Sequence, residues 1–131
     1  MEKQNFETCI EELVKDIINC VSEKDYNELE QIAVIDEEWI EEDEDQNDGF
    51  RRFEDWIEDQ LESWEEETGE EFVIDPFDRE YMEIDIDRDN ENCALVTYTP
   101  TSDSEDLEIW FEFRCTVDDN DKVKVVFTVN M

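Results

Sequence analysis

The apolar residues of this chain change their spacing once, near residue 71, and this change limits the fold more than any other sequence feature. Before it, apolar side chains recur every three or four residues, as on one face of a helix. After it they recur at every second position, as on one face of a strand. This order predicts an α+β fold in which about three N-terminal helices pack on one face of a C-terminal antiparallel sheet of four to five strands. The length favours a single acidic domain over residues 1–131.

The clearest helix is predicted at residues 4–21, where apolar side chains occupy one helical face without an exception. A second helix is expected to begin two residues later, because Ser22 followed by Asp25 resembles a capping box. Residues 32–35 fit two interpretations equally well. They either continue this helix or break it, in which case Asp36 caps a further turn.

The third helix is predicted to follow an interruption at residues 47–49, because the sequence Asn-Asp-Gly is typical of a turn. Apolar side chains follow helical spacing behind it, and acids occupy the remaining faces. Gly69 stands where a left-handed cap would end this helix.

Five strands are predicted in the second half of the chain, at residues 72–74, 81–87, 93–99, 107–117 and 122–129. The last two are expected to form a long hairpin across residues 118–121. Residues 93–99 are expected to lie between this hairpin and the acidic strand at 81–87. Residues 101–106 form the polar connection.

Acidic residues outnumber basic ones by 44 to 10, which gives a formal net charge of −34. Residues 36–71 hold 19 of the acids and only two arginines. The same segment carries large apolar side chains, whereas disordered acidic tails have few aromatic residues. These side chains are Trp39, Ile40, Phe50, Phe53, Trp56, Ile57, Leu61 and Trp64. The acids are therefore expected on a folded surface, with the aromatic residues mainly in the core.

The density of this charge resembles that of a nucleic acid. If residues 36–67 are mostly helical, a net charge of −15 is spread over about 48 Å at roughly 1.5 Å per residue. One charge per about 3 Å compares with one phosphate per about 3.4 Å along a strand of duplex DNA. A chain this negative repels DNA, RNA and anionic membranes, so the expected partner is a basic protein surface.

Several classes of function are disfavoured by what the sequence lacks. Histidine is absent, which removes the commonest general base and metal ligand and excludes Ser-His and Cys-His nucleophiles. No nucleotide or phosphate-loop fingerprint occurs, so neither an enzyme nor a cofactor is expected. The four cysteines lack CxxC spacing, which favours buried free thiols. Without a membrane span or a signal peptide, a cytoplasmic protein is expected.

Residues 43–55 resemble a calcium-binding EF-hand loop in composition but not in register. Alignment on Asp43 places the glycine one position late, at Gly49. Alignment on that glycine leaves Gln46 at a ligand position. With acids this frequent, a chance match is the better interpretation, and no metal site is expected. Residues 118–121 are likewise interpreted as a turn.

Residues 67–74, Glu-Thr-Gly-Glu-Glu-Phe-Val-Ile, resemble a local stretch of the acidic phage inhibitors of uracil-DNA glycosylase. In that family the first helix also runs into the next element through a Glu-Thr-Gly turn and a Val-Ile pair. The resemblance covers eight residues, and Asp75, Pro76 and Phe77 stand where the family has its edge-strand contact motif. No functional residue is therefore carried over, and the resemblance adds a little to the likeness between this charge and that of a nucleic acid.

The spacing of the acids also approximates that of successive phosphates. Acids four residues apart on a helix, such as Glu62 and Glu66, lie about 6 Å apart. Glu83, Asp85 and Asp87 would lie about 7 Å apart on one face of a strand. The alternative is a face that charge merely keeps soluble, yet solubility needs a net charge of only about 2 to 8.

These observations favour an acidic nucleic-acid mimic. It would bind and occlude the basic DNA- or RNA-binding site of a nuclease or other nucleic-acid-handling host-defence protein, as a phage anti-restriction or anti-CRISPR protein does. The expected mechanism is steric and electrostatic occlusion without catalysis. The residues expected to contact the partner are Glu37, Glu38, Glu41, Glu42, Glu44, Glu58, Glu62, Glu66, Glu83, Asp85, Asp87 and, as an exposed aromatic anchor, Trp110.

Two alternatives remain open. An immunity protein that neutralises a cognate basic toxin would have the same charge and a different partner. A module of another class, salt-adapted or buffering divalent cations, would have no inhibitory role. Isoleucine outnumbers alanine 11 to 2, and this excess of large apolar residues argues against salt adaptation.

Overall fold

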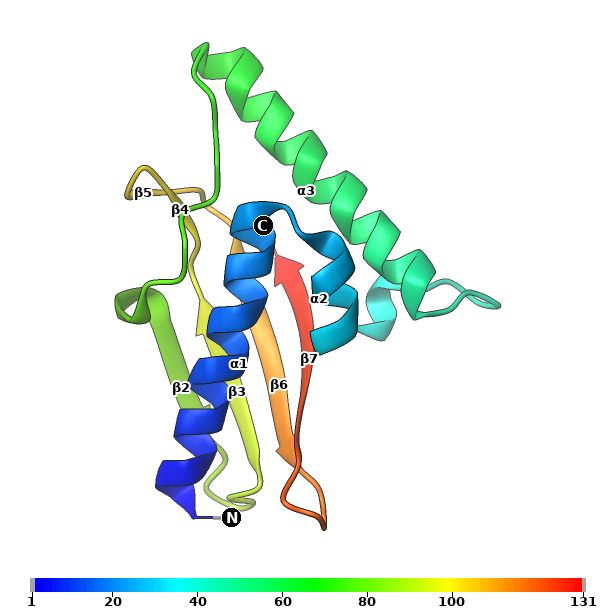
Figure 1. Cartoon of the computed structure of the whole chain (residues 1–131), viewed down its shortest axis with the longest axis vertical. Helices are drawn as coiled ribbons and strands as arrows, with labels where there is room; N and C mark the ends of the chain where they lie inside the picture. The colour runs from blue at the N-terminus through cyan, green and yellow to red at the C-terminus, as the bar shows by residue number, and fades with distance from the viewer. Residues whose placement is uncertain (1, 131) are drawn as a thin grey trace.

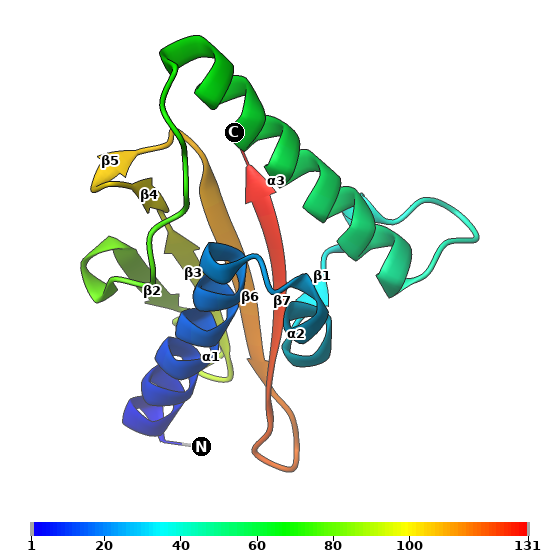
Figure 2. The same cartoon turned by 45° about the horizontal axis from the view of Figure 1, so that its top comes forward.

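Helices cover one face of a five-stranded sheet in the computed structural model, which describes residues 2–130 (Figures 1 and 2). The strand order is β1-β7-β6-β3-β2. The strands are β1 (Val34–Ile35), β2 (Met82–Ile86), β3 (Cys93–Tyr98), β6 (Trp110–Val117) and β7 (Val123–Asn130). Neighbours are antiparallel except β1, which pairs in parallel with β7. The predicted α+β class is confirmed, and the sheet is mixed rather than wholly antiparallel.

Three α-helices occur within residues 2–130, together with short 3₁₀ turns and a two-stranded ribbon. The helices are α1 (Lys3–Glu23), α2 (Tyr26–Ile32) and α3 (Gln46–Thr68), the turns are η1 (Glu37–Trp39) and η2 (Arg79–Tyr81), and the ribbon pairs β4 (Thr101–Ser102) with β5 (Glu105–Asp106). Figure 1 shows α1 running along the strands and α3 crossing at an angle near the end of β7.

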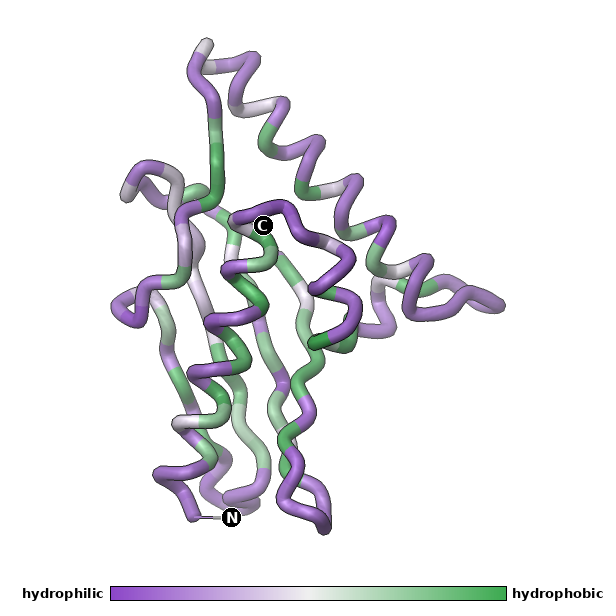
Figure 3. Tube along the Cα trace, viewed as in Figure 1, coloured by the Kyte–Doolittle hydropathy of each residue, from purple (hydrophilic) through white to green (hydrophobic). Residues whose placement is uncertain are grey.

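The core lies between the helices and the sheet. Phe53 of α3 packs edge-on against Phe111 of β6 and Phe127 of β7, with ring centroids 6.2 and 5.3 Å apart. α1 buries one continuous face, formed by Phe6, Ile10, Val14, Ile17, Ile18, Cys20 and Val21. Figure 3 shows hydrophobic and hydrophilic positions alternating along α1 and along the strands. The predicted helix at residues 4–21 is therefore confirmed.

A left-handed residue separates α1 from α2. Lys24 has a φ of 60°, and the N–H of Asp25 bonds back to the carbonyl of Cys20 at 2.8 Å. The Asp25 carboxylate then accepts a hydrogen bond from the N–H of Glu28 at 3.2 Å and caps α2. α2 therefore begins at Tyr26, three residues later than predicted.

The predicted strand at residues 72–74 is wrong. This segment pairs with no strand among the described residues, because side chains bind its backbone groups instead. The Glu65 carboxylate accepts from its first N–H at 3.1 Å, and the Ser102 hydroxyl accepts from its second at 3.3 Å. Ser22 donates to its last carbonyl at 2.6 Å, so this serine serves the segment rather than a capping box.

α3 begins before the predicted interruption at residues 47–49. Asp45 and Asp48 form a capping box in which each carboxylate accepts from the backbone N–H of the other, at 3.1 and 3.2 Å. The start of α3 was therefore predicted too late. Its end is confirmed, because Gly69 takes a φ of 75° and caps the helix.

Gly49 lies inside the first turns of α3 because of close packing. A Cβ atom at this position would lie 2.8 Å from Cγ2 of Ile35 and 2.9 Å from Cγ1 of Ile40. The absence of a side chain at residue 49 therefore allows α3 to pack closely against Ile35 of β1 and against Ile40.

Three connections between elements bear on the predictions. The first decides between the two interpretations of residues 32–35, and the other two differ from what was predicted. Residues 32–35 contain the break, and the Asp36 carboxylate caps η1. β6 begins three residues later than predicted, because Glu108 takes a φ of 60°. Residues 101–106, expected as a polar connection, include the small ribbon.

The four cysteines carry free thiols, as predicted. Cys20 and Cys115 are buried, and Cys9 and Cys93 are half-buried. Burial raises the pKa of the Cys115 thiol to about 12 and, with help from nearby acids, that of Cys20 to about 11. Both thiols therefore stay protonated and unreactive near neutral pH. Within residues 2–130, no helix has the length and apolar character needed to cross a membrane.

Candidate protein-binding surface

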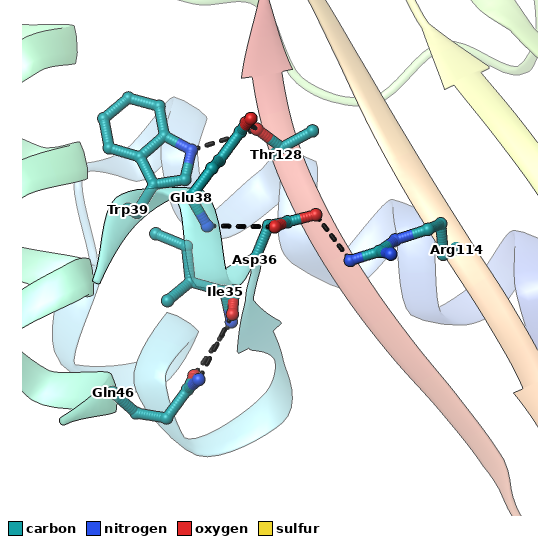
Figure 4. Close-up of polar contacts among 7 residues, drawn as sticks. All are labelled: Ile35, Asp36, Glu38, Trp39, Gln46, Arg114 and Thr128. Carbon is teal, nitrogen blue, oxygen red and sulfur yellow. Dashed lines mark hydrogen bonds and ion pairs between the residues drawn. The ribbon is translucent and has the colours of Figure 1, made fainter. Parts of the chain in front are cut away.

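Polar contacts fix the start of the acidic segment to the sheet (Figure 4). The Gln46 side chain accepts from the N–H of Ile35 at 2.9 Å and donates to the carbonyl of the same residue at 3.2 Å. The Asp36 carboxylate forms an ion pair with Arg114 of β6 at 2.5 Å. These contacts hold the chain on both sides of η1, so the acids between them have defined positions.

Two of the acids expected to contact a partner, Glu38 and Glu44, serve the fold instead. The Thr128 hydroxyl accepts a hydrogen bond from the indole N–H of Trp39 at 3.0 Å and donates one to Glu38 (Figure 4). Arg52 donates a hydrogen bond from Nη2 to Glu44 at 3.0 Å, and its Nη1 lies 2.9 Å from the other carboxylate oxygen. The hydrogen bond from this arginine holds the pKa of the Glu44 carboxyl below its ordinary value. Glu38 and Glu44 therefore do not have the free carboxylates that the sequence suggested.

Glu37, Glu41 and Glu42 are exposed, and their carboxylates have no ion pair or side-chain hydrogen bond among the described residues. Apart from η1, the chain here is not helical. The helical geometry assumed for residues 36–67 therefore holds from residue 46 onward, and between residues 36 and 45 only η1 is helical.

Glu58 of α3 belongs to the contact between α2 and α3. Its half-buried carboxylate accepts a hydrogen bond from the Tyr26 hydroxyl at 2.8 Å and lies 3.4 Å from Nζ of Lys24. Burial and the hydrogen bond to Glu58 raise the pKa of Tyr26, which stays neutral. Glu58 thus stabilises the packing of two helices, whereas it was expected from the sequence to contact a partner in place of a phosphate.

The face of α3 opposite the core carries four exposed carboxylates, which we name the acidic ridge: Asp55, Asp59, Glu62 and Glu66. They follow one another at intervals of four, three and four residues, so neighbours lie about 5 to 6 Å apart. Among the described residues, none of the four forms an ion pair or a side-chain hydrogen bond. The ridge is therefore a continuous line of uncompensated charge.

The charge density of α3 rises along its length. The whole helix, Gln46–Thr68, carries nine acids and two arginines over about 35 Å, or about one net charge per 5 Å. From residue 54 to residue 67 it carries eight acids and no base over about 21 Å, or about one charge per 2.6 Å. The phosphate-like density is thus confined to the C-terminal part of the helix.

Repulsion between acids adds to the effect of burial on the pKa of one residue of α3. Burial raises the pKa of the Glu54 carboxyl, and the neighbouring charges of Asp55, Glu58 and Glu30 raise it further. Each added carboxylate therefore costs the helix free energy unless a cation from outside compensates it.

The remaining predicted acids lie on another side of the molecule. Glu83 and Asp85 of β2, followed by Asp87, are exposed. Successive side chains of a strand point to opposite faces, and Met82 is buried on the face that the helices cover, so these acids point away from the helices. β2 is an edge strand of the sheet, and charge on an edge strand also prevents pairing with other chains. The structure does not bring these acids together with the acidic ridge.

Trp110 is 37 % exposed on the same face as these strand acids. Its indole N–H donates to the Glu112 carboxylate at 3.2 Å. The sequence correctly indicated an exposed aromatic residue here.

Two residues of the acidic ridge, Asp55 and Asp59, were missed by sequence reasoning. The signal was present in the apolar stripe, because positions about two residues beyond Phe53 and Ile57 point away from the core at 100° per residue. Selecting acids by their spacing alone chose Glu58, which lies at the side of the helix.

No group of three acidic or sulfur ligands within residues 2–130 is arranged to hold a metal ion. In the segment that resembles a calcium loop, Asp45 and Asp48 cap α3 instead. Comparison of the chain with protein-family models, with curated proteins and with solved structures finds no match.

Proposed function

We propose that this protein is an acidic inhibitor that binds the basic nucleic-acid site of another protein and keeps DNA or RNA out of it. The acidic ridge supports this proposal, because it presents four carboxylates at near-phosphate spacing with no internal cation. The target class is a nuclease or another nucleic-acid-handling host-defence protein. The inhibitor would act in the cytoplasm of the cell that contains the target.

A face kept acidic for solubility alone is the weaker explanation of the ridge. Like charges four residues apart destabilise a helix by about 0.2 to 0.5 kcal/mol per pair. α3 holds several such pairs, including Asp55 with Asp59 and Glu62 with Glu66. Solubility needs a net charge of only about 2 to 8, far less than the −34 of this chain. The excess charge favours association with a cationic surface of another protein.

The mechanism needs no chemical step. Lysine and arginine side chains that hold phosphates in the target's site would bind the ridge carboxylates through charge-assisted hydrogen bonds. Phe53 packs on Phe127 of the sheet, and Trp64 near the C-terminal end of α3 packs on Phe72 with ring centroids 6.0 Å apart, so α3 is held at two points. The ridge is therefore presented by a helix that is already formed, which lowers the cost of ordering it on binding.

The proposal is tested by capture and competition. The immobilised protein is exposed to host lysate at low salt, and the proteins that elute at about 0.5 M NaCl are identified and purified. Binding of each candidate to labelled DNA or RNA is then measured by fluorescence polarisation with increasing amounts of this protein. Displacement of the nucleic acid at one-to-one stoichiometry is the expected result.

A charge-matched pair of variants shows whether the ridge is the surface responsible. The ridge variant carries Asp55→Asn, Asp59→Asn, Glu62→Gln and Glu66→Gln, and it should bind the target at least about tenfold more weakly. The control variant carries Glu12→Gln, Asp16→Asn, Glu23→Gln and Glu28→Gln, which neutralise exposed acids of the first two helices and their boundary. Equal affinities of the two variants would reject the ridge, and captured proteins that keep their nucleic acid would reject the function.

A further inference from the structure

The face of the sheet that points away from the helices carries a second pattern of side chains. α1, α2 and α3 all lie on the other face (Figures 1 and 2), where β6 and β7 bury Phe111, Phe113 and Phe127. Alternation along the strands turns Leu95 of β3 and Trp110 of β6 to the open face.

Two large apolar side chains are exposed on this open face. Leu95 is 46 % exposed and Trp110 is 37 % exposed, and with Val73 they are the exposed large apolar residues within residues 2–130. Leu95 pairs with Arg114 of β6, and Trp110 lies four residues from Arg114 in the same strand. Trp110 is therefore one strand away from Leu95 and about 13 Å further along the sheet. Thr97 and Glu112, which pair directly, lie between them. Single exposed apolar residues are ordinary, whereas two on one flat face suit a contact with another protein.

A hollow of about 710 Å³ opens beside Leu95. Its lining includes Asp85, Cys93, Arg114 and Thr116, so it spans β2, β3 and β6. Apolar side chains of a partner can enter it and contact Leu95, which would remove further apolar surface from water.

Acids lie along the path between these apolar positions, whereas the hollow itself is lined by charges of both signs, Asp85, Asp87, Arg88 and Arg114. Glu83 and Asp85 are exposed on β2, and Glu112 lies on β6 between Leu95 and Trp110. The Arg114 guanidinium beside the hollow is paired with Asp36 at 2.5 Å and is therefore already compensated.

We infer that the open face docks a basic amphipathic segment of a partner protein. Apolar side chains of the segment contact Leu95 within the hollow and Trp110, and its lysines or arginines pair with Glu83, Asp85 and Glu112. A second copy of this chain is a poor occupant, because it would bring the same acids and another net charge of −34 against them. The inference goes beyond the proposed function, since this face is separate from the acidic ridge.

The test uses two synthetic peptides and amide spectra of the ¹⁵N-labelled protein. One peptide is an amphipathic helix of leucine and lysine, and the other has the same charge with glutamine in place of leucine. The leucine peptide should bind more tightly and shift the amide signals of β2, β3 and β6 and the Trp110 indole. Leu95→Thr, which keeps strand propensity, and Trp110→Ser should each weaken this binding about fivefold to tenfold. Val73→Ser, an equally exposed apolar residue elsewhere, should leave it unchanged.

Three results would overturn the inference. Equal affinity for both peptides would show that charge alone binds them, and signals shifting on α3 instead of the sheet would place binding elsewhere. A dimer in analytical ultracentrifugation that Leu95→Thr abolishes would assign the face to a second copy. Each of these results leaves the proposed inhibition untouched, because displacement of nucleic acid from the target is measured separately with the ridge variant.

Discussion

The Tyr26 hydroxyl donates a hydrogen bond to the Glu58 carboxylate across the contact between α2 and α3, with 2.8 Å between the two oxygens. One acid of the most acidic helix is therefore structural, while its neighbours on the acidic ridge are uncompensated. The two kinds of acid should respond to substitution in opposite ways.

Tyr26→Phe should lower the free energy of unfolding by about 1 kcal/mol, because it removes the shorter of the two hydrogen bonds to the half-buried Glu58 carboxylate and leaves only the one from Lys24. Urea denaturation of the parent and of Tyr26→Phe, Glu58→Gln and the double variant measures the coupling between the residues. Neutralising the ridge should instead raise stability, because repulsion along the helix is relieved. Additive effects of the two single substitutions would contradict the coupling.

Gly49→Ala should destabilise the protein, although alanine favours a helix over glycine by about 1 kcal/mol. The added methyl group would overlap Ile35 and Ile40, and overpacking of this kind costs about 1 to 3 kcal/mol. Ser63→Ala, at an exposed position of the same helix, serves as the control and should give a small gain. A higher midpoint of urea denaturation for Gly49→Ala would mean that the two isoleucines move aside at little cost.

Salt should stabilise the free protein. A net charge of −34 opposes compaction, and ions screen this repulsion over about 10 Å at 0.1 M. The melting temperature should rise between low salt and about 0.5 M NaCl. Urea is the suitable denaturant for companion measurements, because guanidinium chloride is itself a salt. A flat or falling melting temperature would contradict the expected self-repulsion.

The contribution of Asp75 to stability should disappear in acid. Burial of this carboxyl raises its pKa. Hydrogen bonds from the N–H of Ser104, the Thr101 hydroxyl and the N–H of Asp103 together lower the pKa by more than burial raises it, so it lies below the ordinary value. The stabilisation is fully present above the unfolded pKa of about 3.9 and is lost as the pH falls through the lower folded pKa. The difference in unfolding free energy between the parent and Asp75→Asn should therefore shrink below about pH 4. A difference that does not vary with pH would exclude the charge of Asp75 as its cause.

Glu54 should show the opposite pH dependence. Burial and neighbouring acids raise its folded pKa, so the folded state binds the proton more readily than the unfolded chain does. The contribution of Glu54 to stability should then grow as the pH falls through this raised folded pKa and be fully present below the unfolded pKa of about 4.3. Glu54→Gln should remove part of this increase, and an unchanged pH profile of the melting temperature would contradict the assignment.

The periodic parts of the fold could be read from the sequence, and the parts held by single side chains could not. α1 and the hairpin of β6 and β7 follow their apolar spacing closely. The break at Lys24 depends on a left-handed residue that is not glycine, and lysine gives no sign of this conformation. Residues 72–74 look like a strand, but Glu65, Ser102 and Ser22 bind the backbone that a neighbouring strand would otherwise pair with.

Charge composition pointed to the third helix, and two of its four ridge residues, Glu62 and Glu66, were among the expected partner-binding acids. Which acids remain uncompensated depends on tertiary contacts, such as those of Glu38 with Thr128 and of Glu44 with Arg52. These contacts join residues from different elements or turns of the chain, so acid spacing alone could not distinguish Glu58 from Asp59.

The last turn of α3 places Glu65, Glu66 and Glu67 at the end where a helix carries its partial negative charge, and no basic residue lies there. Each such acid is unfavourable by about 0.3 to 1 kcal/mol, whereas a cation at this end would be favourable by a similar amount. A lysine or arginine of a partner would therefore supply the charge that this helix end lacks. Binding should then slow the hydrogen exchange of the amides in the last turn even where the partner does not cover them, so that the same contact both completes the helix and forms the complex.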